Sequence, residues 1–412
     1  MARMSEEMGR RDFLRSVTAA GLGSLAASAT AGAGQGRPDG PKPPAKIAKR
    51  VLGRTGVEIP VLGLGTMFNV VENQLMLHRC VEWGVTHWDT ATAYGGGNSE
   101  LGIGLFLERN PHLRSELFLA TKASLFGQPR TIDWVEKRLQ QSLERMKTSY
   151  IDLYYGIHDL TDPTELRPEL KEWAEQAKRR KLIRYFGFST HRNMADCLLT
   201  ASKLDWIDAV ITTYNFRVMQ DRKMQEAVDA CHKAGIGLVA MKVQGQGSAK
   251  KIETDEDKRL TDHFVKRGFT PGQAKVKVIL EDERIASLAM GRGNISHMAE
   301  NVAAALDKPR LSRSDRDTLK RYAFATCGGY CAGCTSICGG AVSGMPYVSD
   351  VMRYLMYYNG YGEHAQARAL FAALPQAARH RLTRVDYTAA ERLCPQGMPI
   401  AELMAEAEQK LA

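Results

Sequence analysis

The chain lacks several features that would assign it to common protein classes. After residue 34 it contains no apolar run of about 20 residues, the length that a buried transmembrane span requires. Its first β-type run is not followed by a Gly-x-Gly-x-x-Gly turn, because "LGLGTM" has another spacing, which disfavours an open doubly wound dinucleotide-binding sheet. Part of the formal net charge of +10 lies in the first fifty residues. The mild excess that remains does not call for a nucleic acid as partner.

The remaining sequence has the composition of a globular protein, with 412 residues, 44% of them hydrophobic and 25% charged. Short β-type runs alternate with periodic, charged stretches such as "TIDWVEKRLQQSLERMKT", which suit amphipathic helices. The β-type runs are 61–66, 85–91, 117–124, 151–159, 183–190, 209–215, 236–242 and 285–291. Eight strands separated by helices predict an α/β fold, the (β/α)8 TIM barrel.

Polar residues stand at the ends of three of these runs. In a parallel barrel the chemistry gathers at the carboxyl ends of the strands, where Asp89, Lys122 and His158 lie and where Tyr94 follows shortly. A neighbouring ammonium favours the ionised form of a phenol, so we expect Lys122 to lower the pKa of Tyr94. Asp89 would hold the charge of the lysine, and His158 would donate a hydrogen bond to a carbonyl oxygen. Each of the four alone has an ordinary structural explanation.

Taken together and in order, these motifs resemble the aldo-keto reductase superfamily. The similarity is carried by "DTATAYG", "SELG", "ATK", "DLYYGIHD" and "FGFS", and it extends from about residue 49 to residue 305. The resemblance implies a catalytic tetrad of Asp89, Tyr94, Lys122 and His158, with Tyr94 as the general acid or base. It also implies hydride transfer between a small-molecule carbonyl compound or alcohol and NADP or NAD.

The same resemblance implies a set of cofactor contacts. Ser189 matches the serine that contacts the nicotinamide carboxamide, and the segment "MGRGNISHMAENV" matches the one that binds adenosine, where Arg292 would favour NADP. The sequence departs from the pattern in three places: Ile211 replaces a glutamine, Thr190 replaces an asparagine, and Met241 and Lys242 replace a stacking aromatic. The expected cofactor-binding residues are Ser189, Thr190, Tyr214, Met241, Lys242, Gly291, Arg292, Asn294, Glu300 and Asn301.

About a hundred residues follow the barrel, and cysteines are concentrated in them. Cys331, Cys334 and Cys338 lie in "CGGYCAGCTSICGG", and Cys394 precedes a proline in "CPQGMP". Three interpretations remain open: disulfides, a tetrahedral zinc site and an iron–sulfur cluster, whose usual spacing this run approaches. Cys327 is an alternative ligand.

The extension also resembles the ferredoxin-like C-terminal region of one branch of aldo-keto reductases. That resemblance implies one [4Fe-4S] cluster at most, because the second cysteine motif keeps only Cys394 and its proline. We therefore expect two functional alternatives: a carbonyl–alcohol oxidoreductase, or an exported iron–sulfur protein for electron transfer or redox sensing whose barrel holds a nucleotide.

The amino-terminal segment "GRRDFLRSVTAAGLGSLAASATAGAG" has the parts of an export signal. Arg10 and Arg11 precede Phe13 and Leu14, a weakly apolar stretch and small-residue cleavage sites. This order resembles the twin-arginine signal, which implies the twin-arginine export machinery as partner, a location outside the cytoplasmic membrane and no membrane span after processing. We expect a signal peptide at 1–34, a linker at 35–48, the barrel at 49–310 and a helical cysteine-containing extension at 311–412.

Overall fold

The computed structural model describes residues 46–124, 130–249, 254–291, 294–307 and 309–412. The predicted signal peptide, most of the predicted linker and Arg292 lie outside these residues. Their assignments therefore stay predictions.

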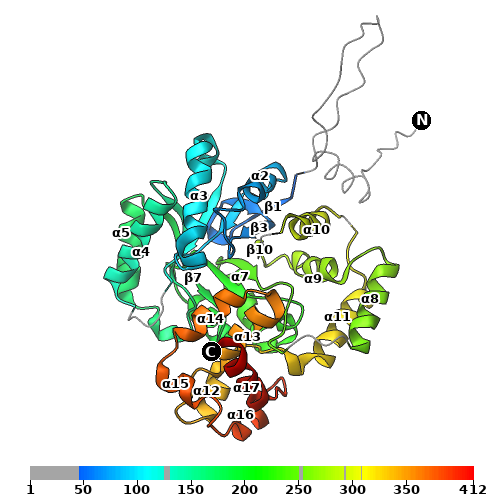
Figure 1. Cartoon of the computed structure of the whole chain (residues 1–412). Helices are drawn as coiled ribbons and strands as arrows, with labels where there is room; N and C mark the ends of the chain where they lie inside the picture. Colours follow the sequence, from blue (N-terminus) through cyan, green and yellow to red (C-terminus); the bar gives the residue numbers. More distant parts are fainter. Residues whose placement is uncertain (1–45, 125–129, 250–253, 292–293, 308) are drawn as a thin grey trace, which may run out of the picture.

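Eight parallel strands form a closed barrel (Figure 1), which confirms the predicted fold class for this part of the chain. The strands are β3 (Leu62–Gly65), β4 (His87–Asp89), β5 (Phe118–Lys122), β6 (Ile151–Ile157), β7 (Ile183–Thr190), β8 (Ala209–Thr213), β9 (Gly237–Met241) and β10 (Ser287–Met290). Each strand pairs with the next one, and β10 closes the ring against β3.

The strands are buried on both faces, as apolar runs without alternation require. One apolar cluster, which includes Leu153, Ile211 and Val239, fills the barrel interior, and a larger one lies between the strands and the helices. Gly187 permits the close approach of β7 and β8, because a Cβ there would lie 1.8 Å from the carbonyl oxygen of Ala209. The barrel therefore holds its strand ends on a packed core.

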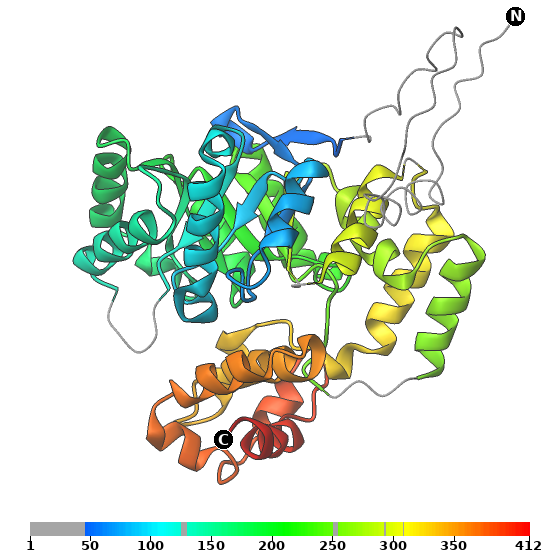
Figure 2. The same cartoon turned by 45° about the horizontal axis from the view of Figure 1, so that its top comes forward.

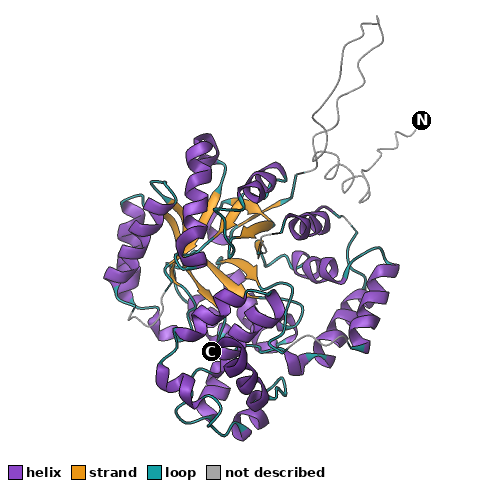
Figure 3. Ribbon diagram, viewed as in Figure 1, coloured by secondary structure: helices purple, strands orange, loops and turns teal. Residues whose placement is uncertain are grey.

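Helices surround the barrel (Figure 3). They are α2 (Gln74–Glu82), α3 (Asn98–Arg109), α4 (Ile132–Arg145), α5 (Pro168–Arg179), α6 (Met194–Ala201), α7 (Arg222–Lys233), α8 (Asp255–Lys266), α9 (Pro271–Leu280) and α10 (Ile295–Leu306). Two features differ from the expected pattern. The connection between β9 and β10 holds two helices, and an antiparallel hairpin of β1 (Lys49–Val51) and β2 (Glu58–Pro60) lies near the starts of β7 and β9.

The C-terminal part of the chain divides between two cores. Helix α11 (Arg313–Ala325) lies beside α8 (Figure 2), and its Leu319 and Tyr322 pack into the core of the barrel. A separate apolar cluster runs from Val342 to Leu411. Its elements are α12 (Thr335–Ala341), α13 (Val348–Leu355), the π-helical turn η7 (Met356–Tyr361), α14 (His364–Ala372), α15 (Gln376–Arg381), α16 (Thr388–Leu393) and α17 (Ile400–Leu411). We call residues 326–412 the helical module.

The helical module lies against the carboxyl ends of the barrel strands. The loop after β7 contacts it through two residues: the Asn193 amide donates to the carbonyl oxygen of Gly333 at 2.9 Å, and Arg192 pairs with Asp350 on α13. The loop after β9 contacts it through Ser248, whose carbonyl oxygen accepts a hydrogen bond from Asn359 at 2.7 Å. In the described part of the chain, no helix is both long enough and apolar enough to cross a membrane.

Candidate active site

The barrel brings the four residues of the predicted tetrad together at one end. Asp89 and Lys122 are the last residues of β4 and β5, and His158 directly follows β6. Tyr94 begins the 3-10 turn η2 (Tyr94–Gly97), in which all three glycines have positive φ. Glycine adopts this conformation without steric cost, so the turn returns the chain to the rim immediately after Asp89.

Asp89 and Lys122 form a buried ion pair. The Lys122 Nζ donates to Asp89 Oδ2 at 2.6 Å and to the carbonyl oxygen of Thr90 at 2.7 Å. Burial raises the pKa of Asp89 and lowers the pKa of Lys122, and the mutual attraction of the two charges opposes both shifts. The second carboxylate oxygen, Asp89 Oδ1, is buried without a hydrogen-bond partner within the described residues.

Tyr94 lies beside this pair, but its titration differs from our expectation. The Lys122 Nζ is 5.0 Å from the centre of the Tyr94 ring. Burial, and next to it the charge of Asp89, raise the pKa of Tyr94 well above its usual value. The predicted lowering by Lys122 is therefore wrong, because the ammonium charge is committed to Asp89 and burial penalises the phenolate. Tyr94 is a neutral phenol that can donate a proton.

His158 faces Tyr94 across the site. The two rings are 6.0 Å apart and nearly perpendicular, and the Ser124 hydroxyl lies 2.5 Å from His158 Nδ1. Burial and the nearby Lys122 lower the pKa of His158 well below its usual value, so the ring is neutral. When Ser124 donates to Nδ1, the ring proton is on Nε2, which is the tautomer that can donate to a carbonyl oxygen.

A groove runs from this site across the barrel end. It combines predicted catalytic and predicted cofactor-binding residues. The predicted residues in its wall are Asp89, Tyr94, Met241, Lys242, Gly291, Glu300 and Asn301. The structure thus joins the tetrad to the end of β9 and the start of α10, as a dinucleotide extended across the barrel would require.

Other predicted cofactor contacts do not line the groove. Ser189 Oγ accepts a hydrogen bond from the Asp159 amide at 2.9 Å, and the Thr190 hydroxyl donates to the Arg192 carbonyl oxygen at 2.9 Å. Asn294 caps α10, where its side chain accepts from the Ser296 amide. Tyr214 is fully buried and its hydroxyl donates to Asp282 Oδ2 at 2.8 Å. The predicted contact at Tyr214 is wrong, because its side chain packs between the barrel and the helices.

The groove also contains residues that the sequence did not point to. His297 lines it from α10, one helical turn before Glu300 and Asn301. Residues three and four positions apart share one face of a helix, so this spacing could have pointed to His297. Tyr361 and Glu363 line it from the helical module. The Lys242 ammonium lies 5.0 Å from the Tyr361 ring centre and 4.4 Å from that of Tyr357. No local motif signals these contacts of the module, since they depend on how the chain folds back over the barrel.

The predicted cysteine ligands converge in the helical module. Cys331, Cys334, Cys338 and Cys394 line one small cavity, whose other walls are mostly apolar. Cys327 lines a different cavity, together with Cys334. The eight cysteines are free thiols, and in the described ranges no group of three or more His, Cys, Asp or Glu side chains is arranged to hold a metal ion. The structure therefore shows a gathering of thiols and no preformed site for one ion.

A closed parallel barrel with a buried Asp–Lys pair, a tyrosine and a histidine beside a groove at its carboxyl edge defines a class of barrel oxidoreductases. The chain belongs to the Aldo/keto reductase family, which residues 61–321 match. It is an aldo-keto reductase type of oxidoreductase that interconverts carbonyl compounds and alcohols with a nicotinamide nucleotide. Residues 322–412 lie outside the family match.

Named relatives are similar to the barrel part of the chain. An L-glyceraldehyde 3-phosphate reductase of Escherichia coli O157:H7 is 25% identical over 302 residues, which cover 62% of this chain and 86% of the relative. An L-galactose dehydrogenase of Arabidopsis thaliana is 24% identical over 66% of this chain and 92% of its own length. A solved thermostable aldo-keto reductase in complex with the inhibitor epalrestat has a TM-score of 0.54 and 26% identity over 67% of this chain and all (100%) of its own.

Proposed function

We propose that the protein reduces a carbonyl compound, or oxidises the corresponding alcohol, with Tyr94 as the proton donor or acceptor. The bound nicotinamide nucleotide supplies or accepts the hydride. In reduction, the Tyr94 hydroxyl gives its proton to the carbonyl oxygen as the carbonyl carbon gains the hydride, and a phenolate is left. In oxidation, the phenolate takes the proton of the alcohol. The raised pKa of Tyr94 keeps the acid form available at neutral pH.

The other three residues support this proton transfer. Lys122, held by Asp89, stands beside the Tyr94 ring, where its positive charge stabilises a phenolate as it forms. His158 donates its Nε2–H to the carbonyl oxygen and directs that oxygen toward Tyr94. A neutral imidazole suits this role, because a hydrogen-bond donor orients the oxygen without competing to protonate it.

The groove supports binding of the nucleotide. Met241 and Lys242 would contact its nicotinamide half, and Gly291, Glu300 and Asn301 would contact its adenosine half. His297 joins this set from the same face of α10. Arg292, which precedes this helix in the sequence, would pair with a 2′-phosphate, so NADP is the proposed cofactor.

The observation that carries the proposal is the meeting of the four residues: Asp89 and Tyr94 line the groove, Lys122 pairs with Asp89, and His158 faces Tyr94. Tyr94→Phe should lower NADPH oxidation against a panel of aldehydes, ketones and sugars by about 10²-fold to 10⁴-fold, the usual share of general acid catalysis. Tyr155→Phe is the matched control, because Tyr155 is another buried tyrosine near Lys122, at 5.8 Å. An unchanged rate in Tyr94→Phe would contradict the mechanism.

For the helical module we propose one [4Fe-4S] cluster bound by Cys331, Cys334, Cys338 and Cys394. Four thiols in a common, mostly apolar cavity are the donor set that such a cluster uses. A single tetrahedral zinc ion would need its sulfur ligands roughly 3.8 Å apart, at bond lengths of about 2.3 Å. Metal analysis therefore distinguishes a single zinc ion from a cluster, whose ligands bind different irons.

Anaerobically purified protein tests the cluster proposal. We expect iron and sulfide in equal amounts and a broad visible absorption band, with both lowered in Cys334→Ser. Cys327→Ser is the control, because Cys327 does not line the cavity that the four proposed ligands share. Zinc in place of iron, or loss of iron in the Cys327 variant alone, would contradict the assignment.

The cysteine cavity also favours the second function predicted from the sequence, electron transfer or redox sensing with the nucleotide held in the barrel. The Tyr94→Phe assay separates the two functions. Turnover that needs iron and is indifferent to Tyr94 would establish the second and exclude the first.

We further propose that residues 1–34 direct export by the twin-arginine machinery and that the mature protein is periplasmic or otherwise extracytoplasmic. The paired arginines and the small-residue sites support this. That route carries folded proteins, which suits a barrel loaded with a nucleotide. Replacement of Arg10 and Arg11 by lysine should leave the protein in the cytoplasm on fractionation, and unchanged export would contradict the proposal.

A further inference from the structure

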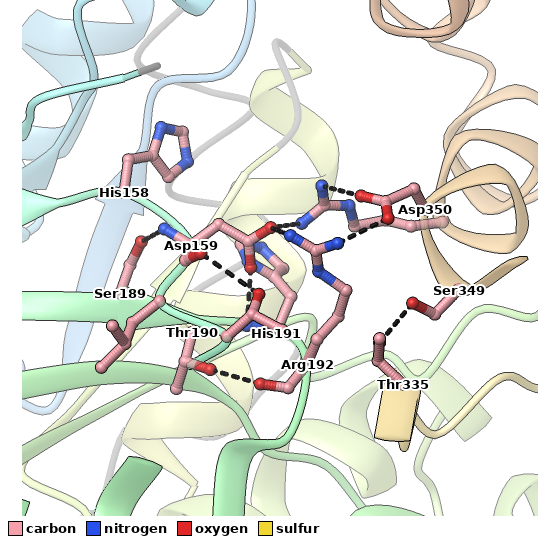
Figure 4. Close-up of polar contacts among 12 residues, drawn as sticks. His158, Asp159, Ser189, Thr190, His191, Arg192, Thr335, Ser349 and Asp350 are labelled. Atoms are coloured by element: carbon pink, nitrogen blue, oxygen red, sulfur yellow. Dashed lines mark hydrogen bonds and ion pairs between the residues drawn. The ribbon is translucent and has the colours of Figure 1, made fainter. Parts of the chain in front are cut away.

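A group of charged residues lies directly behind the active site, where the helical module meets the barrel. Asp159 follows His158 in the chain, and Figure 4 shows its carboxylate within reach of His191 and Arg192. Arg353 of α13 completes the group from the module. The barrel contributes one arginine to this carboxylate and the module contributes the other.

Hydrogen bonds hold both the backbone and the carboxylate of Asp159. Its φ of +66° is unusual for a residue other than glycine, and its amide donates to Ser189 Oγ at 2.9 Å. Its Oδ1 accepts from the His191 amide at 3.1 Å. Its Oδ2 accepts from Arg192 at 2.7 Å and from Arg353 at 2.6 Å. A left-handed backbone of this kind persists only where surrounding contacts hold it in place.

The charges balance within the group. Arg192 also donates to Asp350 Oδ2 at 2.5 Å, so that two arginines and two aspartates neutralise one another. All four side chains are at most 17% exposed. Burial alone would raise the pKa of Asp159, but Arg353 and Arg192 outweigh it and hold that pKa well below its usual range. Removal of one partner would leave a buried charge without compensation.

We propose that Arg353 is a positioning residue for the reaction: it fixes Asp159, and through Asp159 the adjacent His158 and the hydroxyl of Ser189. The active site is then composite, since the barrel carries the reacting groups and α13 holds one of them, His158, in position. The inference rests on the proposed role of His158. It goes beyond that role because it assigns a part in hydride transfer to the helical module, which lies outside the family match.

The alternative is that Arg353 only stabilises the contact between the barrel and the helical module. Arg217 provides the matched control for that possibility. It is a half-buried arginine at the same junction, and it donates to the carbonyl oxygens of Gly245 at 3.1 Å and of Thr326, in the module, at 3.3 Å. It has no contact with Asp159 or with the tetrad among the described residues. A merely structural role predicts similar behaviour of variants at the two positions.

The test compares Arg353→Met, Arg353→Lys and Arg217→Met in the full-length protein. We expect kcat to fall about 10-fold to 100-fold in Arg353→Met, the usual cost of losing a group that orients an active-site residue, while KM for NADPH changes little. Arg353→Lys should recover part of kcat, because it keeps the charge without the forked geometry. Arg217→Met should lose thermal stability with an unchanged kcat. Equal kcat in the Arg353 and Arg217 variants would overturn the proposal.

A second measurement keeps the proposal testable without turnover. The ¹⁵N shifts of His158, assigned with His158→Gln, report its tautomer. We expect Nδ1 without a proton in the wild type and a mixed tautomer in Arg353→Lys, the variant that best preserves folding. An unchanged tautomer together with an unchanged kcat would overturn the positioning role. A normal rate in Tyr94→Phe would instead refute the proposed function. The His158 shifts would still show whether Arg353 positions the imidazole, so the two failures are distinguishable.

Discussion

At the residue scale, the active site depends on one ion pair that is shielded from water. The side chain of Lys122 is 0% exposed and that of Asp89 is 6% exposed. Two buried charges cost much desolvation energy, which only close contact and further hydrogen bonds recover. The carbonyl oxygen of Thr90 supplies one such bond to Lys122. The pair is therefore a weak source of stability, and in the proposed mechanism it acts through its effect on Tyr94.

This argument predicts the effect of breaking the pair. Lys122→Met should lower the free energy of unfolding by about 3 to 5 kcal/mol, because it leaves the Asp89 carboxylate buried and uncompensated. The double variant Lys122→Met with Asp89→Asn should recover much of that loss while it stays inactive. Urea denaturation of the four proteins in this cycle measures the coupling. Additive losses would show that the two charges do not depend on one another.

The pH dependence of the reaction follows from the two shifted groups. Tyr94 must be protonated to act as the acid, and its pKa is raised, so carbonyl reduction should persist through the neutral range and decline only above about pH 10, the ordinary phenol value. His158 is neutral because its pKa is lowered, so no inflection near pH 6.5 should come from it. Profiles of kcat/KM for the wild type and His158→Gln check both points. An acid limb near pH 6.5 that His158→Gln removes would contradict the account.

The sequence was sufficient to identify the tetrad residues but not their titration. Asp89, Lys122 and His158 could be found because each ends a recognisable strand, and parallel strand ends meet at one rim. The pKa of Tyr94 could not be found, because its sign depends on burial and on which partner Lys122 prefers. Tyr214 was predicted to contact the cofactor because it lies near a strand end. That position does not say toward which side of the strand the side chain points, and the hydroxyl donates to Asp282 instead.

At the element scale, the eight barrel strands could be located within a few residues. Their apolar runs are continuous because both faces are buried, and charged helical stretches separate them. The hairpin of β1 and β2 was missed, since its short strands have no such pattern. The loop that carries Cys331 and Cys334 is held by contacts that the periodicity of the sequence does not predict. One of them is the hydrogen bond from the Asn193 amide to the carbonyl oxygen of Gly333.

Gly333 is the most sensitive position of that loop. Its φ is +77°, and a Cβ there would lie 2.4 Å from the carbonyl oxygen of His191. Gly333→Ala should push the loop that carries Cys331 and Cys334 away from the barrel and lower both iron content and thermal stability. Gly340→Ala is the control, because a Cβ there meets nothing within 4 Å. Thermal unfolding and iron analysis check the prediction, and equal values for the two variants would contradict it.

At the scale of the whole molecule, the helical module closes over the barrel end. Its contacts join residues that are 158 and 194 positions apart, such as Arg192 with Asp350 and Asp159 with Arg353. Pairings between residues so far apart in the sequence leave no local signal. The sequence therefore indicated an extension after the barrel but not where it would lie on the barrel. The structure shows that the module takes part in both the groove and the rear of the active site.

This placement predicts slow release of the nucleotide. Because Tyr361 and Glu363 of the module line the groove with the barrel residues, the bound nucleotide should be enclosed from both parts of the chain. The protein should retain nucleotide through gel filtration, detectable by absorbance at 260 nm (an ordinary nucleotide band) and by chromatography of the denatured supernatant. Tyr361→Ala should release it faster than Tyr358→Ala, whose ring packs on His364 outside the groove. Complete loss from the wild type would contradict the enclosure.

The central claim is that a nicotinamide nucleotide transfers a hydride to a carbonyl carbon while Tyr94, supported by the other residues of the tetrad, protonates the carbonyl oxygen. It is tested most directly with NADPH that carries deuterium at C4, in separate samples for each face of the ring, and with mass spectrometry of the alcohol product. We predict one deuterium on the former carbonyl carbon from one labelled face only, and product formation that disappears in Tyr94→Phe but continues in Tyr155→Phe. Alcohol that contains no deuterium from either sample would contradict the account.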